Sequence, residues 1–228
     1  MSIEVVLPGL QTTIQDHGRY GCRHMGVPQS GAADLFSYKL ANFLLGQLPN
    51  ATVLECTLTG PRLRFLSNMQ IMITGADMQP EVNGSAIDMF APFRIQAGDE
   101  LIMQACLVGC RSYIAFSKDL VCDSFMGSSS TYLPAKLGGL NGKPLASGDV
   151  IATTGDKAQQ GRHLESLENL GQNLSNDWVL TALPGPEFDA VDEASKKLLF
   201  SETYTVTNDS NRMGNRLIGP ELKIEKVD

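Results

Sequence analysis

The densest group of residues with reactive or charged side chains lies in one stretch near the N-terminus. Its members include Asp16, Arg19, Pro28, Gly31 and Asp34, with further glycines at 18, 21 and 26. Glycine and proline at such short intervals are typical of a loop whose backbone passes close to a ligand while its polar side chains converge on it. The alternative is a loop that packs on the fold, with Asp16 and Arg19 paired only for stability.

A second group of polar residues lies near the C-terminus, directly after an apolar run. Asn211 and Arg212 stand there together, and Arg216 follows four residues later. A guanidinium offers a forked set of donors that matches a carboxylate or a phosphate, so this segment is a candidate anion site. The alternative is an exposed turn whose arginines pair with Asp209 or Glu221.

Other reactive residues lack the spacing that their chemistry needs. His17, His24 and Cys22 match no usual zinc pattern, so we expect no metal. The serines at 128–130 lie outside any G-x-S-x-G motif, and nothing local identifies a base. Gly142 and Lys143 lack the upstream glycine of a phosphate-binding loop. Neither a nucleophilic serine nor a nucleotide loop is therefore predicted.

The elements that must position these groups are mostly strands. Alternating or β-branched residues predict nine of them, at Ile3–Leu7, Val53–Leu58, Leu63–Leu66, Gln70–Thr74, Leu101–Gln104, Ser112–Phe116, Val150–Thr154, Trp178–Leu183 and Tyr204–Thr207. Asn83-Gly84 between apolar flanks predicts a tight hairpin, because both residues tolerate the positive φ of a type I′ turn. Scattered glycines and prolines agree with many short strands.

Two segments have helical spacing. The first runs from about Asp34 to Leu45, where Phe36, Leu40, Phe43 and Leu44 fall on one stripe, Asp34 is a candidate N-cap and Gly46 can close the end. The second runs from about Pro186 to Phe200, with acidic residues early and lysines late, which matches the helix dipole. The sequence therefore predicts a mainly β fold with two short helices.

Composition and charge exclude several classes of protein. The chain has 228 residues, 43% of them hydrophobic, and a formal net charge of −7, so we expect a packed core and no binding to nucleic acid. No apolar run approaches the length that spans a bilayer, and no secretion signal is visible, so we expect a cytoplasmic protein away from the membrane. Five cysteines without a paired motif agree with reduced thiols.

A polar stretch divides the chain. Gln159–Asp177 is rich in Gln, Asn, Ser and Glu and predicts a linker with at most one short helix near Leu164–Leu170. We expect a boundary near residue 180, with a β subdomain over 1–180 and the start of a second one over 181–228. So short a second part rarely makes a core of its own.

Short motifs along most of the chain follow one another in the order of one known family: Pro8–Thr13, Gln15-Asp16, Gly18-Arg19, Gly26–Pro28, Gly31-Ala32, Asp34, Ala41-Asn42, Leu54-Glu55, Gly60-Pro61, Gly127-Ser128, Ser130-Thr131, Gly138-Gly139, Gly148-Asp149, Pro184–Pro186 and Ser210–Gly214. In these motifs the chain resembles the allophanate hydrolase subunit 2 family. The family is also called KipA, or the C subunit of 5-oxoprolinase, and it is similar to the carboxyltransferase region of urea carboxylase, a biotin-dependent enzyme.

The resemblance implies a fold, a reaction and partners. It implies a β-rich fold with cyclophilin-like barrel character, beside a sister subunit of the allophanate hydrolase subunit 1 (KipI) type and a third component of the LamB/YcsF type. Together these are associated with the ATP-dependent opening of 5-oxoproline to glutamate. Alternatives within the family are urea or allophanate breakdown by amide hydrolysis or carboxyl transfer, and a non-catalytic partner that regulates a KipI-type subunit.

The two polar clusters and the family match together suggest site roles. We assign Arg19 and Arg212 to binding a carboxylate or oxyanion, and Asp16 and Asp34 to orienting those arginines or to acid–base work. Substrate-binding candidates are Asn42, Asn211, Gly31 and Pro28. No Met-Lys signature for biotin attachment is present, so we expect no covalent cofactor on this chain, and we expect ATP to be used by the complex.

The chain departs from the family pattern at named places. The family's Gly-Ser-Arg-Ser-Thr-Asp reads Gly-Ser-Ser-Ser-Thr-Tyr over 127–132, which loses an arginine and an aspartate, and the arginine expected before Pro184 is Thr181. The family also continues into a Gln-Thr-x-Gly-Gly-Tyr segment after the arginine motif, whereas this sequence stops at Asp228. These departures predict an incomplete second β subdomain and favour the non-catalytic alternative.

Overall fold

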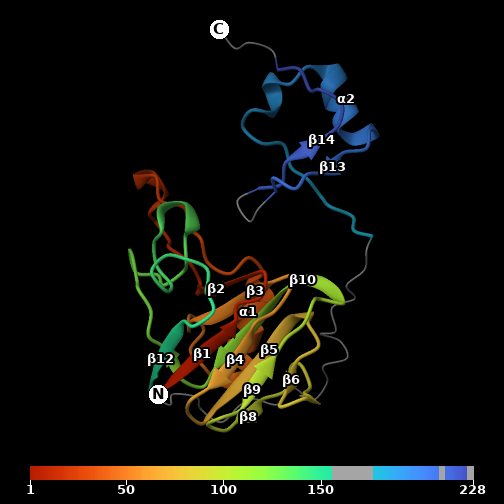
Figure 1. Cartoon of the computed structure of the whole chain (residues 1–228). Helices are drawn as coiled ribbons and strands as arrows, with labels where there is room; N and C mark the ends of the chain where they lie inside the picture. Colours follow the sequence, from red (N-terminus) through yellow and green to blue (C-terminus); the bar gives the residue numbers. More distant parts are fainter. Residues whose placement is uncertain (156–176, 211–213, 225–228) are drawn as a thin grey trace. The chain divides into compact units, whose positions relative to one another are not determined.

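The fold is described on a computed structural model of the whole chain, over residues 1–155, 177–210 and 214–224. The chain divides into two compact units, Met1–Ser175 and Asn176–Asp228, and Figure 1 labels their helices and longer strands. The sequence places its boundary near residue 180, five residues beyond the end of the first unit. The helix expected near 164–170 lies outside the described residues.

Two antiparallel sheets build the first unit. In sheet order, the seven-stranded sheet contains β11 (Asp119–Leu120), β12 (Val150–Thr154), β1 (Ser2–Leu7), β4 (Arg62–Phe65), β9 (Glu100–Ile102), β6 (Glu81–Val82) and β7 (Ser85–Ala86). The five-stranded sheet contains β2 (Gln11–Gln15), β3 (Val53–Thr57), β10 (Val108–Phe116), β5 (Met69–Asp77) and β8 (Phe93–Ile95). β10 lies between β3 and β5 in register, which places the longest strands at the centre.

Both faces of the five-stranded sheet carry buried side chains, which alternate between two cores. In β5, Ile71 and Ile73 join the core that also contains Ile3 and Val5 of the other sheet. Met72 lies between them in sequence and joins a second core with the helix side chains. Alternate side chains of a strand point to opposite faces, so the layers are sheet, sheet and helix.

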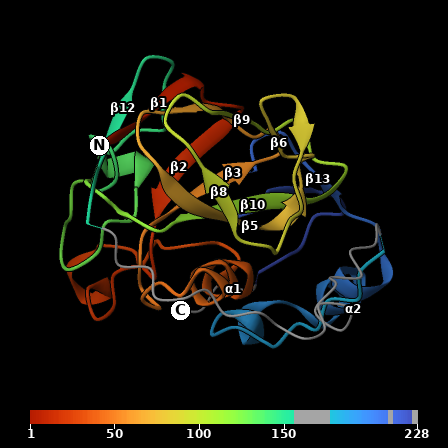
Figure 2. The same ribbon diagram turned by 90° about the horizontal axis from the view of Figure 1, so that it is seen from below.

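The helix α1 (Leu35–Leu45) covers the outer face of the five-stranded sheet, against β5 and β10 (Figure 2). Its N-cap is Asp34, whose carboxylate accepts from the Ser37 N–H at 3.0 Å, and Gly46 closes the end with φ 75°. Both caps are as predicted. The predicted apolar stripe is only half right: Leu40 and Leu44 are buried, whereas Phe36 and Phe43 are 53% and 42% exposed.

The second unit is small and has little buried side-chain area. It contains the 3₁₀ turn η3 (Phe188–Ala190), the helix α2 (Glu193–Ser201) and the paired strands β13 (Thr205–Val206) and β14 (Leu217–Ile218). Among its described residues only Ser195 is buried. A core of this size contributes little to stability, as expected from its length.

Two expectations for this second unit are wrong. The predicted helix from Pro186 begins seven residues later, because Val191 and Asp192 are extended and the Asp192 carboxylate caps the helix by accepting from the Ser195 N–H at 2.7 Å. The predicted strand at Trp178–Leu183 is not formed, and its Val179 is 97% exposed. An apolar run without a partner strand has no ladder to join.

The mainly β class with two α-helices is confirmed. All other predicted strands are present within a few residues, and the short strands β2, β8, β11 and β14 are additional. The predicted hairpin joins β6 to β7, with φ 51° at Asn83 and 79° at Gly84. No helix in the described part of the chain is long and apolar enough to cross a membrane.

The cap of α1 gives a first test of the fold. Replacing Asp34 with alanine removes the acceptor for the Ser37 N–H, so the free energy of unfolding should fall by about 1 kcal/mol in a urea titration. Asp34→Ser should keep most of the stability, because serine is also a good N-cap. Phe36→Ala on the exposed side of the same helix is the control, and a loss there as large as for Asp34→Ala would contradict the cap assignment.

Candidate functional site

Asp16 is the buried carboxylate at the base of the loop that the sequence singles out. It directly follows β2, is 8% exposed, and one of its oxygens accepts from the Gly18 N–H at 2.8 Å. The same oxygen accepts from the hydroxyls of Ser128, at 2.6 Å, and Ser130, and the other oxygen accepts from the Ser129 N–H at 2.6 Å. The side chain therefore joins two segments more than a hundred residues apart.

Arg19 reinforces the same connection from the same loop. It is 1% exposed; its Nε donates to the Phe125 carbonyl at 3.0 Å and its Nη2 donates to the Ser130 carbonyl at 2.5 Å. Burial lowers the pKa of the guanidinium, and the nearby Asp16 charge opposes that shift. Nη1 has no hydrogen-bond partner among the described residues. We call the contacts of Asp16 and Arg19 with residues 125–130 the Asp16 joint.

The loop returns across its own beginning. The Arg19 N–H donates to the Gln29 carbonyl at 2.7 Å, and the Ala32 N–H donates to the Asp16 carbonyl at 2.9 Å. Gly31 has φ 87°, and a Cβ there would lie 2.7 Å from the His17 carbonyl oxygen, so only glycine fits this approach. Pro28 lies half-buried on the returning part of the loop. Gly31 and Pro28 therefore shape the loop.

The far end of the loop is fixed by a second buried carboxylate, Glu55 on β3. It accepts from the Ala33 N–H at 2.8 Å and from the Tyr113 hydroxyl at 3.0 Å, and its other oxygen lies 3.6 Å from Arg111 Nε. The Tyr113 hydroxyl accepts in turn from the Asp34 N–H at 2.8 Å. Burial, with the Glu55 charge second, raises the pKa of Tyr113, so the phenol stays protonated and can donate.

The remaining predicted site residues are engaged in local hydrogen bonds or lie outside the described residues. Asn42 is fully buried in α1 and its amide donates to the Ala51 carbonyl at 3.0 Å, so it holds the segment after the helix. Asn211 and Arg212 lie outside the described residues, and their roles stay predictions. The carboxylate of Asp34 is occupied by the helix cap described above.

The outer part of the loop is exposed and carries different groups. The rings of His17 and Tyr20 stack with centroids 4.7 Å apart, and Tyr20 is 56% exposed. The 3₁₀ turn η1 (Arg23–Met25) follows, with all three residues exposed. The structure thus presents aromatic, imidazole and guanidinium groups to solvent on a loop whose base is held by buried hydrogen bonds. No group of three or more His, Cys, Asp and Glu among the described residues could hold a metal ion.

Sequence reasoning misses the partners of the two carboxylates. Ser128 and Ser130 have no base nearby in sequence, whereas the structure brings Asp16 to them from 112 and 114 residues away. Sequence reasoning identifies Glu55 only as part of a strand and of a family motif, and Tyr113 only as part of a strand; neither is predicted as a site residue. A Glu and a Tyr in strands otherwise made of core residues could have indicated a buried hydrogen-bond network, because buried polar groups need partners.

The family comparison covers most of the chain. The model of the carboxyltransferase domain, subdomains A and B, matches residues 25–227. The C subunit of 5-oxoprolinase from Escherichia coli is 33% identical over 222 residues, which covers 97% of this chain and 70% of that protein. The urea amidolyase of Lachancea kluyveri is 34% identical over 239 residues, which covers all of this chain but only 13% of that protein.

Solved structures show the same likeness in three dimensions. The crystal structure of the K. lactis urea amidolyase matches with a TM-score of 0.87 and 31% identity, over 99% of this chain and 14% of that one. At this identity and score the arrangement of strands and helices is shared over nearly the whole length. The chain corresponds to a small part of that much longer protein.

The Asp16 joint gives a second test. Asp16→Asn replaces an acceptor oxygen with an NH₂ group that faces donors, so the free energy of unfolding should fall by about 2–3 kcal/mol. Asp123→Asn is the matched control, because Asp123 is exposed and accepts one backbone hydrogen bond, from the Asn141 N–H. Urea titrations of both variants provide the comparison, and equal losses would show that Asp16 is no more important than a surface carboxylate.

Proposed function

This chain belongs to the carboxyltransferase domain family, subdomains A and B, and we propose that it serves as the C subunit of an ATP-dependent 5-oxoprolinase complex. The observation that carries the proposal is the match along 97% of this chain to the corresponding E. coli subunit, of which it spans 70%. The complex would open the cyclic amide of 5-oxoproline with water to give glutamate. Opening an amide requires stabilisation of an oxyanion and exclusion of bulk water.

Within this proposal, Asp16 and Arg19 act as positioning residues. All described contacts of the Asp16 carboxylate are with donors of its own chain, which leaves little capacity for acid–base work. Within the Asp16 joint, the Nη1 group of Arg19 has no hydrogen-bond acceptor among the described residues, so its N–H groups could bind a ligand. Arg212 and Asn211 are proposed to bind the substrate carboxylate, because a guanidinium matches it with two parallel hydrogen bonds.

The partners proposed for the complex are a KipI-type subunit, a LamB/YcsF-type subunit and the small amide substrate, in the cytoplasm. ATP use is assigned to the partners. The only double glycine in the sequence has a packing role instead: a Cβ on Gly138 would lie 2.4 Å from the Ser130 carbonyl oxygen, and one on Gly139 would lie 2.0 Å from Thr131 Oγ1. These glycines serve close packing against the Asp16 joint.

A second candidate function is carboxyl transfer to urea. It is favoured by the likeness to the K. lactis urea amidolyase, whose TM-score of 0.87 extends over nearly all of this chain. In that case biotin would arrive on another part of the assembly, since no lysine here follows a methionine. The two candidates differ in substrate and product, so they can be separated by one assay.

The assay measures ADP and glutamate formed from 5-oxoproline by the purified partner subunits, with and without this chain. Turnover should appear only when the chain is added, and Arg212→Ala should reduce it by about a hundredfold if the arginine holds the oxyanion or carboxylate. Arg94→Ala is the matched control, because Arg94 is an exposed arginine on β8, far in sequence from both polar clusters.

Each other outcome of this assay is informative. Turnover with urea and not with 5-oxoproline would transfer the assignment to carboxyl transfer. Binding of the chain to its partners without any effect on turnover would favour the non-catalytic, regulatory alternative. Unchanged turnover with a folded Arg212→Ala variant would contradict the role given to that arginine.

A further inference from the structure

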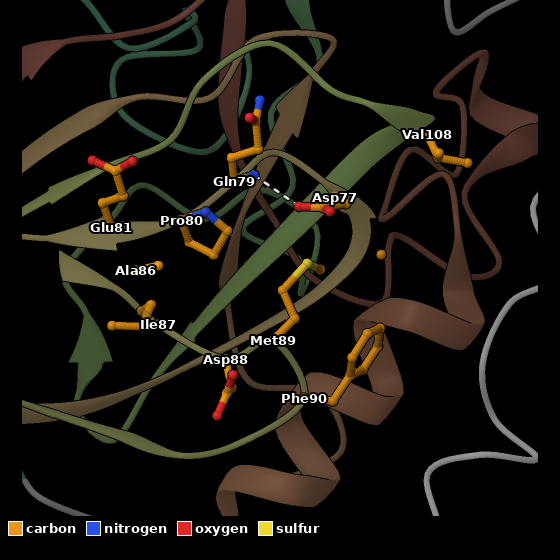
Figure 3. A pocket seen from close by; sticks show the side chains of 11 residues that line it. Asp77, Gln79, Pro80, Glu81, Ala86, Ile87, Asp88, Met89, Phe90 and Val108 are labelled. Atoms are coloured by element: carbon orange, nitrogen blue, oxygen red, sulfur yellow. Dashed lines mark hydrogen bonds between the residues drawn. The ribbon is translucent and has the colours of Figure 1, made fainter. Parts of the chain in front are cut away.

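A groove of about 750 Å³ lies in the first unit, far in sequence from the loop and its joint. One wall runs from the end of β5 to β6 and includes Asp77 and Glu81, and the other runs from β7 to Phe90 and includes Asp88. Val108, at the start of β10, completes the lining (Figure 3). The volume lies within the range of ligand-binding clefts in proteins.

Backbone hydrogen bonds hold both walls in place. The Ile87 N–H donates to the Pro80 carbonyl at 3.0 Å, which ties the two walls together, and the Phe90 N–H donates to the Ile73 carbonyl on β5 at 2.8 Å. The Gln79 N–H donates to the Asp77 carboxylate at 2.8 Å, which fixes the turn between β5 and β6 (Figure 3). A groove held in this way is already formed before a ligand arrives, which lowers the cost of binding.

The lining combines an apolar floor with charge of one sign. Pro80, Ile87, Met89 and Phe90 contribute apolar surface, and three carboxylates stand among them without a lysine or arginine in the lining. Glu81 accepts from Gln104 Nε2 at 3.3 Å, and no donor reaches the Asp88 carboxylate in the described part of the chain. The ligand that complements this groove is therefore cationic with apolar neighbours.

A free strand edge adjoins the groove. β7 is the last strand of the seven-stranded sheet, both of its residues are exposed, and Ala86 also lines the groove. Within the described residues β7 pairs only with β6, so the backbone groups on its other side remain available. An extended peptide can add to such an edge, with alternate side chains directed toward the neighbouring groove.

We propose that this groove binds an extended segment of a partner protein in which every second residue faces the groove, and in which these facing positions include both lysine or arginine and apolar residues. Its backbone pairs with β7, its basic side chains reach Asp77, Glu81 and Asp88, and its apolar side chains pack on the floor near Phe90. The inference rests on the proposed function in one respect: the proposed complex would provide the partner protein that contains this segment. The groove and the strand edge are properties of this chain alone.

The test uses a short fluorescein-labelled peptide in which every second residue is in turn arginine, valine and lysine, with serine between them, titrated with the full chain and followed by fluorescence polarisation. Binding should be saturable and should weaken with added salt. Asp88→Asn should raise Kd about threefold, because Asp88 is exposed and an ion pair at an exposed carboxylate is weakened by solvent and salt. Asp149→Asn, beside β12 near the opposite end of the sheet, makes the same charge change and should leave Kd unaltered.

Three further probes separate this proposal from its rivals. The same peptide with glutamate in place of the basic residues should not bind. N-methylation of its backbone amides should abolish binding, because it removes the donors that pair with β7, and unchanged binding of the N-methylated peptide would contradict the strand pairing. Overturning results are no binding of the basic peptide, equal effects of Asp88→Asn and Asp149→Asn, or equally tight binding of acetyl-arginine amide, which would indicate a small-cation site. Because no partner protein takes part in this titration, a failure here leaves the assay of 5-oxoproline turnover unaffected.

Discussion

A single buried carboxylate, Asp16, organises the region that carries most of the chemically interesting residues. It accepts from a backbone N–H of its own loop and from donors on residues 128–130, so the loop and the segment after β11 are held by one side chain. An ionised carboxylate out of water requires several strong donors, and this environment supplies them. Removing those donors would leave the charge uncompensated, so neither segment can move independently at low cost.

The same principle operates at the other end of the loop and divides its residues into two kinds. Glu55 and Tyr113, joined by a buried hydrogen bond, hold the Ala33 and Asp34 amides through partly buried ones, and the helix α1 starts from that fixed point. Between the two anchors, the stacked His17 and Tyr20 and the turn η1 remain at the surface. A rigid base with an exposed outer part is an arrangement that suits presentation of groups to a substrate or a partner protein, as the proposed complex requires.

Short sequence patterns predict caps and turns well, but they do not predict contacts between residues that are far apart in the sequence. The caps at Asp34 and Gly46 and the turn at Asn83-Gly84 depend on a few adjacent residues, and the structure has all of them. The strand expected at Trp178–Leu183 is wrong because pairing depends on a partner that the segment itself does not specify. Asp16 stands out in the sequence as a candidate, but spacing alone cannot identify its serine partners more than a hundred residues away.

The most direct measurement of the central claim is native-state hydrogen exchange of the Gly18 and Ser129 amides, both of which donate to Asp16. If Asp16 holds the two segments as one unit, replacing Ser128 and Ser130 together with alanine should speed exchange of both amides to a similar extent, although Gly18 lies in the other segment. Faster exchange at Ser129 with unchanged protection at Gly18 would show that the segments are held separately and would contradict the account.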